Sequence, residues 1–226
     1  MKKKNKTIKA LLADINSVYK LKKGQGPVRD FSASGMRFHA LSYQAEGFGH
    51  VGIMTGTGML GLMRIETLIL NPFHVDAPIF SYDRIYAMRK DILVVEMYDS
   101  LLSGSFHTET LEGIVKDCQS QTERKESWYD PLVIPPGLHL KGKGGAYYDA
   151  LSRRFIQAYL AASQKADQCE PAAKRRKASV YTEGLLTYGG PATDPVKRSI
   201  GQAKTADLFR RTLFGTGDPK GGSAHG

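Results

Sequence analysis

The apolar positions near the start of the chain recur at the spacing of an α-helix. Ile8, Leu11, Leu12, Ile15 and Val18 lie three and four residues apart, which predicts an amphipathic helix over residues 7–22. We expect this helix to end in a Lys-rich turn and to lead into a polar, glycine-containing connector.

Between residues 37 and 102 the pattern changes to β-branched and aromatic runs that Gly, Asn-Pro and Asp interrupt. No part of this region keeps a helical period for long, so we interpret it as an antiparallel sheet. The predicted strands cover residues 37–44, 50–56, 61–70, 79–89 and 91–98. The break at Arg89-Lys90-Asp91 predicts a tight hairpin turn.

After residue 102 the pattern becomes helical again. We expect helices over residues 108–125, 146–167, 171–186 and 194–213, the second with an apolar stripe that includes Phe155 and Tyr159. Between residues 128 and 145, Pro131, Pro135 and Pro136 predict a loop. Residues 1–214 then form a single domain, and the glycine-rich residues 215–226 predict a flexible tail.

Composition narrows the class of protein. The chain has 226 residues, of which 41% are hydrophobic, and this suffices for one substantial core. Its 32 Lys and Arg against 22 Asp and Glu give a net charge of +10, which favours an acidic partner: nucleic acid, anionic lipid, an acidic protein or a small carboxylate. The two cysteines, Cys118 and Cys169, exclude a disulfide framework and a zinc ribbon.

The sequence carries no sign of export or of a membrane span. Residues 7–19 keep polar positions among the apolar ones and so lack the continuous apolar run of a signal peptide. No run approaches the roughly 18 apolar residues of a transmembrane helix. We therefore expect a cytoplasmic protein without membrane association, and take a monomer as the default.

Two short motifs match known patterns. Residues 56–61, Gly-Thr-Gly-Met-Leu-Gly, fit the dinucleotide-binding fingerprint G-x-G-x-x-G, but the residues that follow alternate as a strand does. A glycine-rich hairpin is therefore the favoured interpretation. Residues 174–177, Lys-Arg-Arg-Lys, fit a nucleic-acid patch, a docking face for an acidic protein or a solvated helix face.

The histidines do not point to a metal site. They are scattered, and none sits at the spacings that metal or deaminase sites use. His74 and His139 fall in predicted loops and are the two that are able to line a pocket.

Two carboxylates stand out in the predicted sheet. Glu66 and Asp83 interrupt apolar strands, where an ionisable group is unusual unless it is paired, edge-exposed or functional. Arg64 lies two residues before Glu66 on the same strand face, so a surface ion pair explains Glu66 as well as catalysis does.

Two segments of the chain match a family pattern. The first is the stretch from Asp76 to Asp83, D-A-P-I-F-S-Y-D, which is similar to the x-x-P-I-F-G-x-D segment of the ferredoxin-dependent bilin reductases. Residues 193–198, T-D-P-V-K-R, and the following Leu-Phe pairs at 208–209 and 213–214 look like the D-P-A-R helix and closing element of that family. This chain departs from the family pattern at two positions, where Ser81 replaces the usual Gly and Lys197 the usual Arg. The related red chlorophyll catabolite reductases share the fold and chemistry of this family and are a neighbouring possibility.

The resemblance implies a fold and a reaction. The fold is an α/β/α sandwich, a central antiparallel sheet flanked by helices, with the bilin between the sheet and the C-terminal helices. The reaction uses no bound metal or flavin, and reduces the bilin with electrons from reduced ferredoxin, or flavodoxin, and protons from side chains.

The resemblance also implies site residues. Asp83 matches the aspartate that protonates the substrate, Glu66 falls at a position where one branch has a histidine, and Asp194 becomes a second acid or a helix N-cap. We expect Glu66 and Asp83 to share one sheet face. The predicted substrate-binding residues are Phe80, His74 and, for the propionates, Arg64, Arg84, Lys197 and Arg198, with Arg210 a further cation.

Two other functions stay open on the sequence. A non-catalytic tetrapyrrole-binding protein fits the same resemblance, and a basic nucleic-acid-associated protein fits the net charge. Biliverdin absorbance separates the first from the reductase, since only the reductase changes the bilin when reduced ferredoxin is added.

Overall fold

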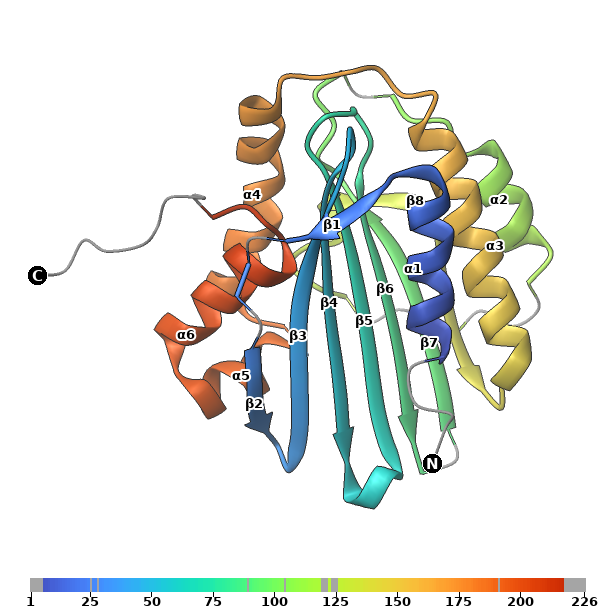
Figure 1. Cartoon of the computed structure of the whole chain (residues 1–226). Helices are drawn as coiled ribbons and strands as arrows, with labels where there is room; N and C mark the ends of the chain where they lie inside the picture. The colour runs from blue at the N-terminus through green and yellow to red at the C-terminus, as the bar shows by residue number, and fades with distance from the viewer. Residues whose placement is uncertain are drawn as a thin grey trace, which may run out of the picture.

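The computed structural model describes residues 6–24, 26–27, 29–88, 90–103, 105–118, 122, 126–190 and 192–217. These residues form an antiparallel sheet of eight strands with helices on both faces, the predicted α/β/α sandwich (Figure 1). The strand order is β1-β3-β4-β5-β6-β7-β8, and β2 shares with β1 the outer edge of β3.

The strands are β1 (Leu21–Lys23), β2 (Arg29–Ala33), β3 (Met36–Ala45), β4 (Gly49–Gly58), β5 (Met63–Pro72), β6 (Ile79–Ala87), β7 (Lys90–Tyr98) and β8 (Val133–Gly142). The helices are α1 (Lys6–Val18), α2 (Glu109–Lys116), α3 (Gly145–Ser163), α4 (Pro171–Tyr188), α5 (Thr193–Ile200) and α6 (Gln202–Asp207). Short turns η1 (Met59–Gly61) and η2 (Asp130–Leu132) and the π-helical segment η3 (Leu208–Leu213) complete the set.

The five predicted strands are confirmed as β3 to β7. The break predicted at residues 89–91 is displaced, because Lys90 and Asp91 already belong to β7 and Ala87 pairs with Lys90, while residue 89 lies outside the described residues. The first helix ends at Val18, four residues earlier than expected, and residues predicted as its Lys-rich end form β1 instead. Here pairing with the free edge of β3 satisfies the backbone groups that a helix would otherwise bond internally.

The predicted loop over residues 128–145 is wrong, since most of it forms β8. This strand lies at the edge of the sheet and pairs only with β7, so a missing proline N–H is tolerated on its outer side. Its register shifts between Val95 and Met97, which pair with Leu138 and Ile134. The three residues between these partners, Pro135, Pro136 and Gly137, form a bulge opposite Glu96.

The C-terminal helices differ from the prediction in where they break. α2 ends at Lys116, and residues 119–121 and 123–125 of the predicted helix lie outside the described residues. The predicted helix 194–213 is divided at Gly201, whose φ of +81° is open to glycine at little cost. Gly215 and Gly217 of the predicted tail form hydrogen bonds with Arg175 and Arg210, and residues 218–226 lie outside the description.

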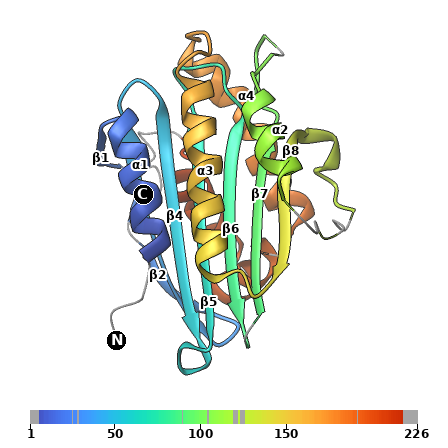
Figure 2. The same cartoon turned by 90° about the vertical axis from the view of Figure 1, so that its right-hand side faces the viewer.

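Alternate residues of each strand face two different helical layers. One core contains Leu68, Phe80 and Val95 and packs under α1 and α3, which Figure 2 shows crossing that face of the sheet. The other contains Ile69, Ile79 and Tyr98 and packs under α4, α5 and η3. Because side chains alternate along a strand, each sheet residue belongs to one layer only.

A buried ion pair holds α4 on the sheet. The Lys174 ammonium is fully buried and donates to Asp76 Oδ1 at 2.7 Å and to the Ser100 carbonyl at 2.6 Å. Asp76 also accepts from the amide and hydroxyl of Ser103. Burial acts to raise the pKa of Asp76, but the bonds from Lys174 and Ser103 outweigh it and lower the pKa to about 2.

Replacing Lys174 is expected to destabilise the whole fold. In Lys174→Met the Asp76 carboxylate stays buried without its cation, which typically costs about 3–5 kcal/mol. Urea unfolding measures this loss. The matched control is Arg176→Met, exposed on the same helix, for which we expect a change within about 0.5 kcal/mol. Equal stabilities for the two variants would show that the pair does not anchor α4.

Candidate active site

Asp83 lies near the middle of β6 on the sheet face that the C-terminal helices cover. It pairs across the strands with Thr67, and the Thr67 hydroxyl donates to Asp83 Oδ1 at 2.5 Å. The Ser81 hydroxyl donates more weakly to Oδ2, at 3.4 Å. Both hydroxyls come from strand residues on the same face, so the sheet itself fixes the orientation of this carboxyl group.

A second carboxylate, Glu96, lies on the same face in β7. Ser81 pairs with Glu96, and Asp83 pairs with Val94 two residues away. The Tyr98 hydroxyl donates to Glu96 Oε2, and His139 Nε2 of β8 lies 3.3 Å from Glu96 Oε1. Three neighbouring strands thus bring two acids and an imidazole together, and the β8 bulge lies directly opposite Glu96.

The surroundings of Asp83 make it a weaker acid than usual. Burial raises its pKa to about 6, and the nearby charge of Glu96 acts in the same direction. The hydrogen bonds from Thr67 and Ser81 oppose this shift without cancelling it. A carboxyl group with a pKa near 6 is protonated often enough near neutral pH to donate a proton.

Aromatic side chains close this site from the α4 side. The rings of Tyr98 and Tyr181 stack with centroids 3.9 Å apart, and Tyr129 meets both rings edge-on. Trp128 packs beside Tyr181 and donates through its indole N–H to the Gly189 carbonyl at 3.0 Å. These contacts tie α4 to the sheet next to the two carboxylates.

Toward the hairpin ends of the strands the same face is apolar and only half-buried. Ile65, Ile85 and Ile92 stand side by side in one cross-strand row, and Val94 lies beside Asp83 in the next. All four are partly accessible, unlike the core positions of these strands. This arrangement is a flat apolar floor with an acid at its border, which suits a planar, largely apolar molecule.

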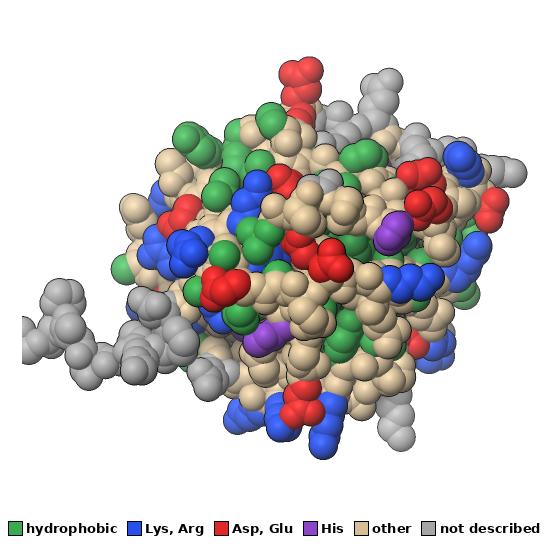
Figure 3. Space-filling view, turned by 90° about the horizontal axis from the view of Figure 1, so that it is seen from above, with side chains coloured by type: hydrophobic (Ala, Val, Ile, Leu, Met, Phe, Trp, Pro, Cys, Tyr) green, Lys and Arg blue, Asp and Glu red, His purple; other side chains and the backbone are tan. Residues whose placement is uncertain are grey.

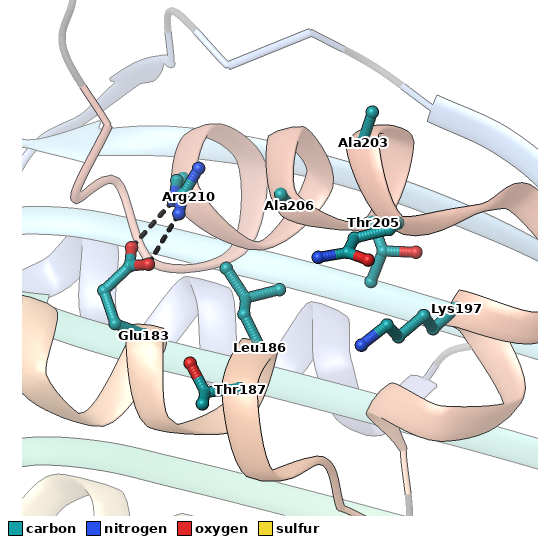
Figure 4. Close-up of a pocket in the computed structure, with 9 residues that line it drawn as sticks. Glu183, Leu186, Thr187, Lys197, Ala203, Thr205, Ala206 and Arg210 are labelled. Atoms are coloured by element: carbon teal, nitrogen blue, oxygen red, sulfur yellow. Dashed lines mark hydrogen bonds and ion pairs between the residues drawn. The ribbon is translucent and has the colours of Figure 1, made fainter.

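A cavity of about 670 Å³ lies among the C-terminal helices. Figure 4 shows Lys197 of α5 and Leu186 of α4 directed toward it, with the Glu183 and Arg210 ion pair at one end. Thr187, Gln202, Ala203, Thr205 and Ala206 complete its lining. The volume is in the range of small-molecule sites, and Lys197 supplies a cation for an acidic group.

Glu66 does not share a face with Asp83, so that prediction is wrong. Glu66 pairs with Arg84, and Asp83 with Thr67, which puts the two carboxylates on opposite sides of the sheet. Glu66 is buried under the α1 and α3 layer, and this burial raises its pKa. The alternative, an ion pair between Glu66 and Arg64, is not found among the described residues. The Arg64 guanidinium stacks on the ring of Tyr86 instead.

Three predicted substrate-binding residues also lie on the face opposite Asp83. Phe80 is buried against Phe155 and Tyr159, and Arg64 shares the face of Glu66. Arg84 is fully buried and is bonded to Asp91 at 2.8 and 2.9 Å and to Asp149. The sheet separates these side chains from Asp83, so Phe80, Arg64 and Arg84 do not line the sheet face that carries it, and their role in substrate binding stays a prediction.

The remaining predicted residues lie at the C-terminal helices or at a strand end. Lys197 lines the cavity, Arg198 is exposed on α5, and His74 lies half-buried in the β5–β6 connection. Asp194 is exposed in the first turn of α5 and is not its N-cap, because the helix already begins at Thr193. Its carboxylate lies against Gly189 instead.

The two short motifs have structural explanations. Gly56 and Gly58 belong to β4 and Gly61 closes the turn into β5 at a φ of +92°, which confirms the predicted hairpin. The 174–177 run does not form a solvated basic face, since Lys174 is buried, Arg175 stacks on Phe73, and Lys177 pairs with Asp99. Its charges are thus largely committed within the protein.

The described ranges also contain no cluster of three or more His, Cys, Asp or Glu side chains able to hold a metal ion. Within them, none of the helices combines the length and the apolar character that a membrane crossing requires.

The sequence does not identify one group that contains Glu96, Tyr98 and His139. Glu96 carries the same signal as Glu66, a carboxylate inside an apolar strand, and the short connection between Ala87 and Lys90 sets the β6–β7 register that brings it beside Asp83. The sequence predicts His139 as a loop residue able to line a pocket, because the prolines before it do not indicate a strand.

Comparisons with known proteins support the fold. The sheet order and the helices on both faces are those of the bilin reductase fold. One solved structure with this fold is phytochromobilin synthase from tomato, in complex with biliverdin. The TM-score is 0.68 and the identity 15%, over 94% of this chain and 83% of that one, so the likeness is one of fold. No family model and no curated protein matches the sequence.

Asp83 and Glu96 share a sheet face, whereas Glu66 lies on the other one. We therefore expect the charge of Glu96, but not that of Glu66, to affect the titration of Asp83. In Glu96→Gln the pKa of Asp83 should fall from about 6 toward its usual value, because a neighbouring negative charge is removed. Glu66→Gln is the matched control and should leave it nearly unchanged. Carbon-detected NMR titration of the Asp83 carboxyl measures both, and a larger effect from Glu66→Gln would contradict the assigned register.

Proposed function

We propose that this protein is an oxidoreductase that reduces a linear tetrapyrrole on the sheet face carrying Asp83. One observation carries the proposal: a carboxyl group with a pKa near 6 borders an apolar floor, in the fold of a synthase whose structure contains biliverdin. A bilin is a long, mostly apolar molecule with two acidic propionates. The apolar floor suits the apolar body of the bilin, and the cation of Lys197 suits a propionate.

The proposed reaction adds two electrons and two protons to one double bond of the bilin. Two reduced ferredoxin molecules, each giving one electron, become oxidised, and no cofactor needs to be bound. A tetrapyrrole radical is much more basic than its parent, so a nearby weak acid suffices to protonate it. We assign the first proton to Asp83, whose protonated form is favoured by burial.

Glu96 and His139 are proposed to maintain the proton supply. Glu96 raises the pKa of Asp83 through its charge, and His139 Nε2 lies 3.3 Å from Glu96 Oε1. The His139 side chain is 20% exposed, so the pair connects the site with solvent and forms a short route by which a proton returns. Glu66, on the other side of the sheet, has no part in this proposal.

The electron donor is proposed to be a small acidic protein of the ferredoxin or flavodoxin type. The net charge of +10 attracts an acidic donor over several ångströms and accelerates its encounter with the enzyme. We keep a non-catalytic tetrapyrrole-binding protein as the alternative within the same fold. The basic nucleic-acid alternative keeps the net charge but loses the 174–177 run as support, because Lys174, Arg175 and Lys177 are engaged in internal contacts.

Removing the proton of Asp83 is expected to separate binding from catalysis. Asp83→Asn should still bind biliverdin, seen as a shifted visible absorption, but its turnover with reduced ferredoxin should fall at least about 100-fold. In the wild type the rate should decline as pH rises through about 6, because the acid form of Asp83 is progressively lost. Stopped-flow absorbance follows both the rate and any trapped radical.

Glu66→Gln serves as the control for this experiment and should keep wild-type turnover. Normal turnover in Asp83→Asn would remove Asp83 from the mechanism. Biliverdin binding without any reduction by the wild type would favour the non-catalytic alternative, and the absence of biliverdin binding would refute both.

Lys197 is expected to bind a propionate of the substrate. In Lys197→Met the KM for biliverdin should rise by about tenfold while kcat changes little, since a charged contact of about 1.4 kcal/mol is lost far from the reacting carbon. Lys204→Met, at an exposed lysine of the neighbouring helix α6 that does not line the cavity, is the matched control. Steady-state kinetics at fixed ferredoxin distinguishes them, and an unchanged KM in the Lys197 variant would remove this residue from the binding site.

A further inference from the structure

One end of the sheet carries large apolar side chains that project into solvent. Met59, Leu60 and Leu62 of the β4–β5 connection and Met88 of the β6–β7 hairpin are 53, 107, 64 and 69% exposed. The two turns are neighbours, since the Met88 amide bonds to the Leu62 carbonyl at 3.4 Å, and Figure 1 shows the β4–β5 turn protruding beyond the strand ends. We refer to these four residues as the apolar tip.

The backbone conformation of the apolar tip is one in which large apolar side chains are rarely found. Met59, Leu60 and Met88 have φ angles of +48°, +54° and +44°, in the left-handed region that large side chains rarely adopt. Glycine or asparagine would fit the same turns with less strain. Local conformation and exposure to water both disfavour large apolar residues at these positions, and strain of this kind concentrates at functional sites.

A group of cations lies directly behind the apolar tip. In the three cross-strand rows of β3 to β8 nearest to it, the cations are Arg37, Arg64, Lys90 and Lys141. The acid in these rows is Asp91, which is buried and bonded to Arg84. At the opposite end of the molecule, in contrast, Figure 3 shows acidic and basic side chains mixed.

We infer that this end of the protein docks on a membrane surface that contains anionic lipids. The apolar tip would enter the boundary between headgroups and acyl chains, and the cations behind it would meet the lipid phosphates and carboxylates. The inference goes beyond the proposed function and does not depend on it. It replaces the expectation of no membrane association, which rested on the lack of a spanning segment, because peripheral binding requires no membrane-spanning helix.

Shape and depth favour a bilayer over a protein partner. Leu60 projects so far that a rigid partner would need a matching pocket, whereas acyl chains adapt to a convex tip. Strands advance about 3.3 Å per residue, so three rows place the cations within about 10 Å of the tip. Peripheral elements insert their apolar face about 5–10 Å deep, which puts these cations at headgroup level.

Co-sedimentation with lipid vesicles tests the inference on the full chain. One set of vesicles contains phosphatidylcholine alone, and the other replaces about a third of it with phosphatidylserine, the anionic lipid expected to attract the cations. We expect binding to the second set, much weaker binding to the first, and a decline as salt screens the charges.

Two variants separate the apolar from the electrostatic contribution. Met59→Asn with Leu60→Asn keeps the net charge and suits the left-handed backbone, and should weaken vesicle binding by about tenfold or more. Lys90→Ser with Lys141→Ser should weaken it by about fivefold for each charge. The controls are Val180→Ser and Arg176→Ser, an apolar and a basic residue exposed on α4, which should bind as the wild type does.

Each outcome decides for or against the inference. Vesicle binding that the asparagine variant and the lysine variant both weaken, with melting temperatures unchanged, supports it. No binding to phosphatidylserine vesicles, or equal binding by the asparagine variant, overturns it. A wild-type dimer that the asparagine variant converts to a monomer in size-exclusion chromatography would also overturn it, since the tip would then join two copies of the chain.

Discussion

The register between β5 and β6 is the constraint on which the rest of the structure depends. Thr67 lies opposite Asp83, and Glu66 opposite Arg84, so one residue of displacement would exchange the two sides of the sheet. The observed register gives Asp83 the Thr67 hydroxyl as a donor, while Ser81 of its own strand and Glu96 of β7 complete its surroundings. On the other face Arg84 lies among carboxylates under α3, where a buried cation needs them.

The two faces use buried charge in different ways. Under α3, Arg84 is bonded to both oxygens of Asp91 and to Asp149, so its charge is matched and serves stability. Under α4, Asp83 has hydroxyl donors but no cation within bonding distance among the described residues, and its pKa rises to about 6. An acid left without a cation is costly for the fold but suited to proton transfer.

Helix α4 and strand β8 complete the site from opposite directions. The Lys174 and Asp76 ion pair fixes the start of α4, and the stacked rings of Tyr98 and Tyr181 fix its middle against the sheet. On the other side, the β8 bulge lies opposite Glu96. His139 follows two residues after the bulge in the same strand. Irregular pairing at this edge therefore shapes the chemistry of the central strands.

The sequence by itself determined the element types, the three-layer fold class and the importance of Asp83, because hydrophobic periodicity and an acid inside an apolar strand are local signals. It could not determine which side chains accompany Asp83. The β5–β6 connection of residues 73–78 is no tight hairpin, so nothing local sets the register that puts Glu66 on the other face. Phe80 and Arg84 belong to the same strand as Asp83 at odd separations, so alternation along the strand already places them there. Likewise, prolines hid β8 and His139, since only pairing with β7 makes that segment a strand. Strand pairing in the tertiary structure places Glu66 and His139, because each placement depends on hydrogen bonds between residues distant in sequence.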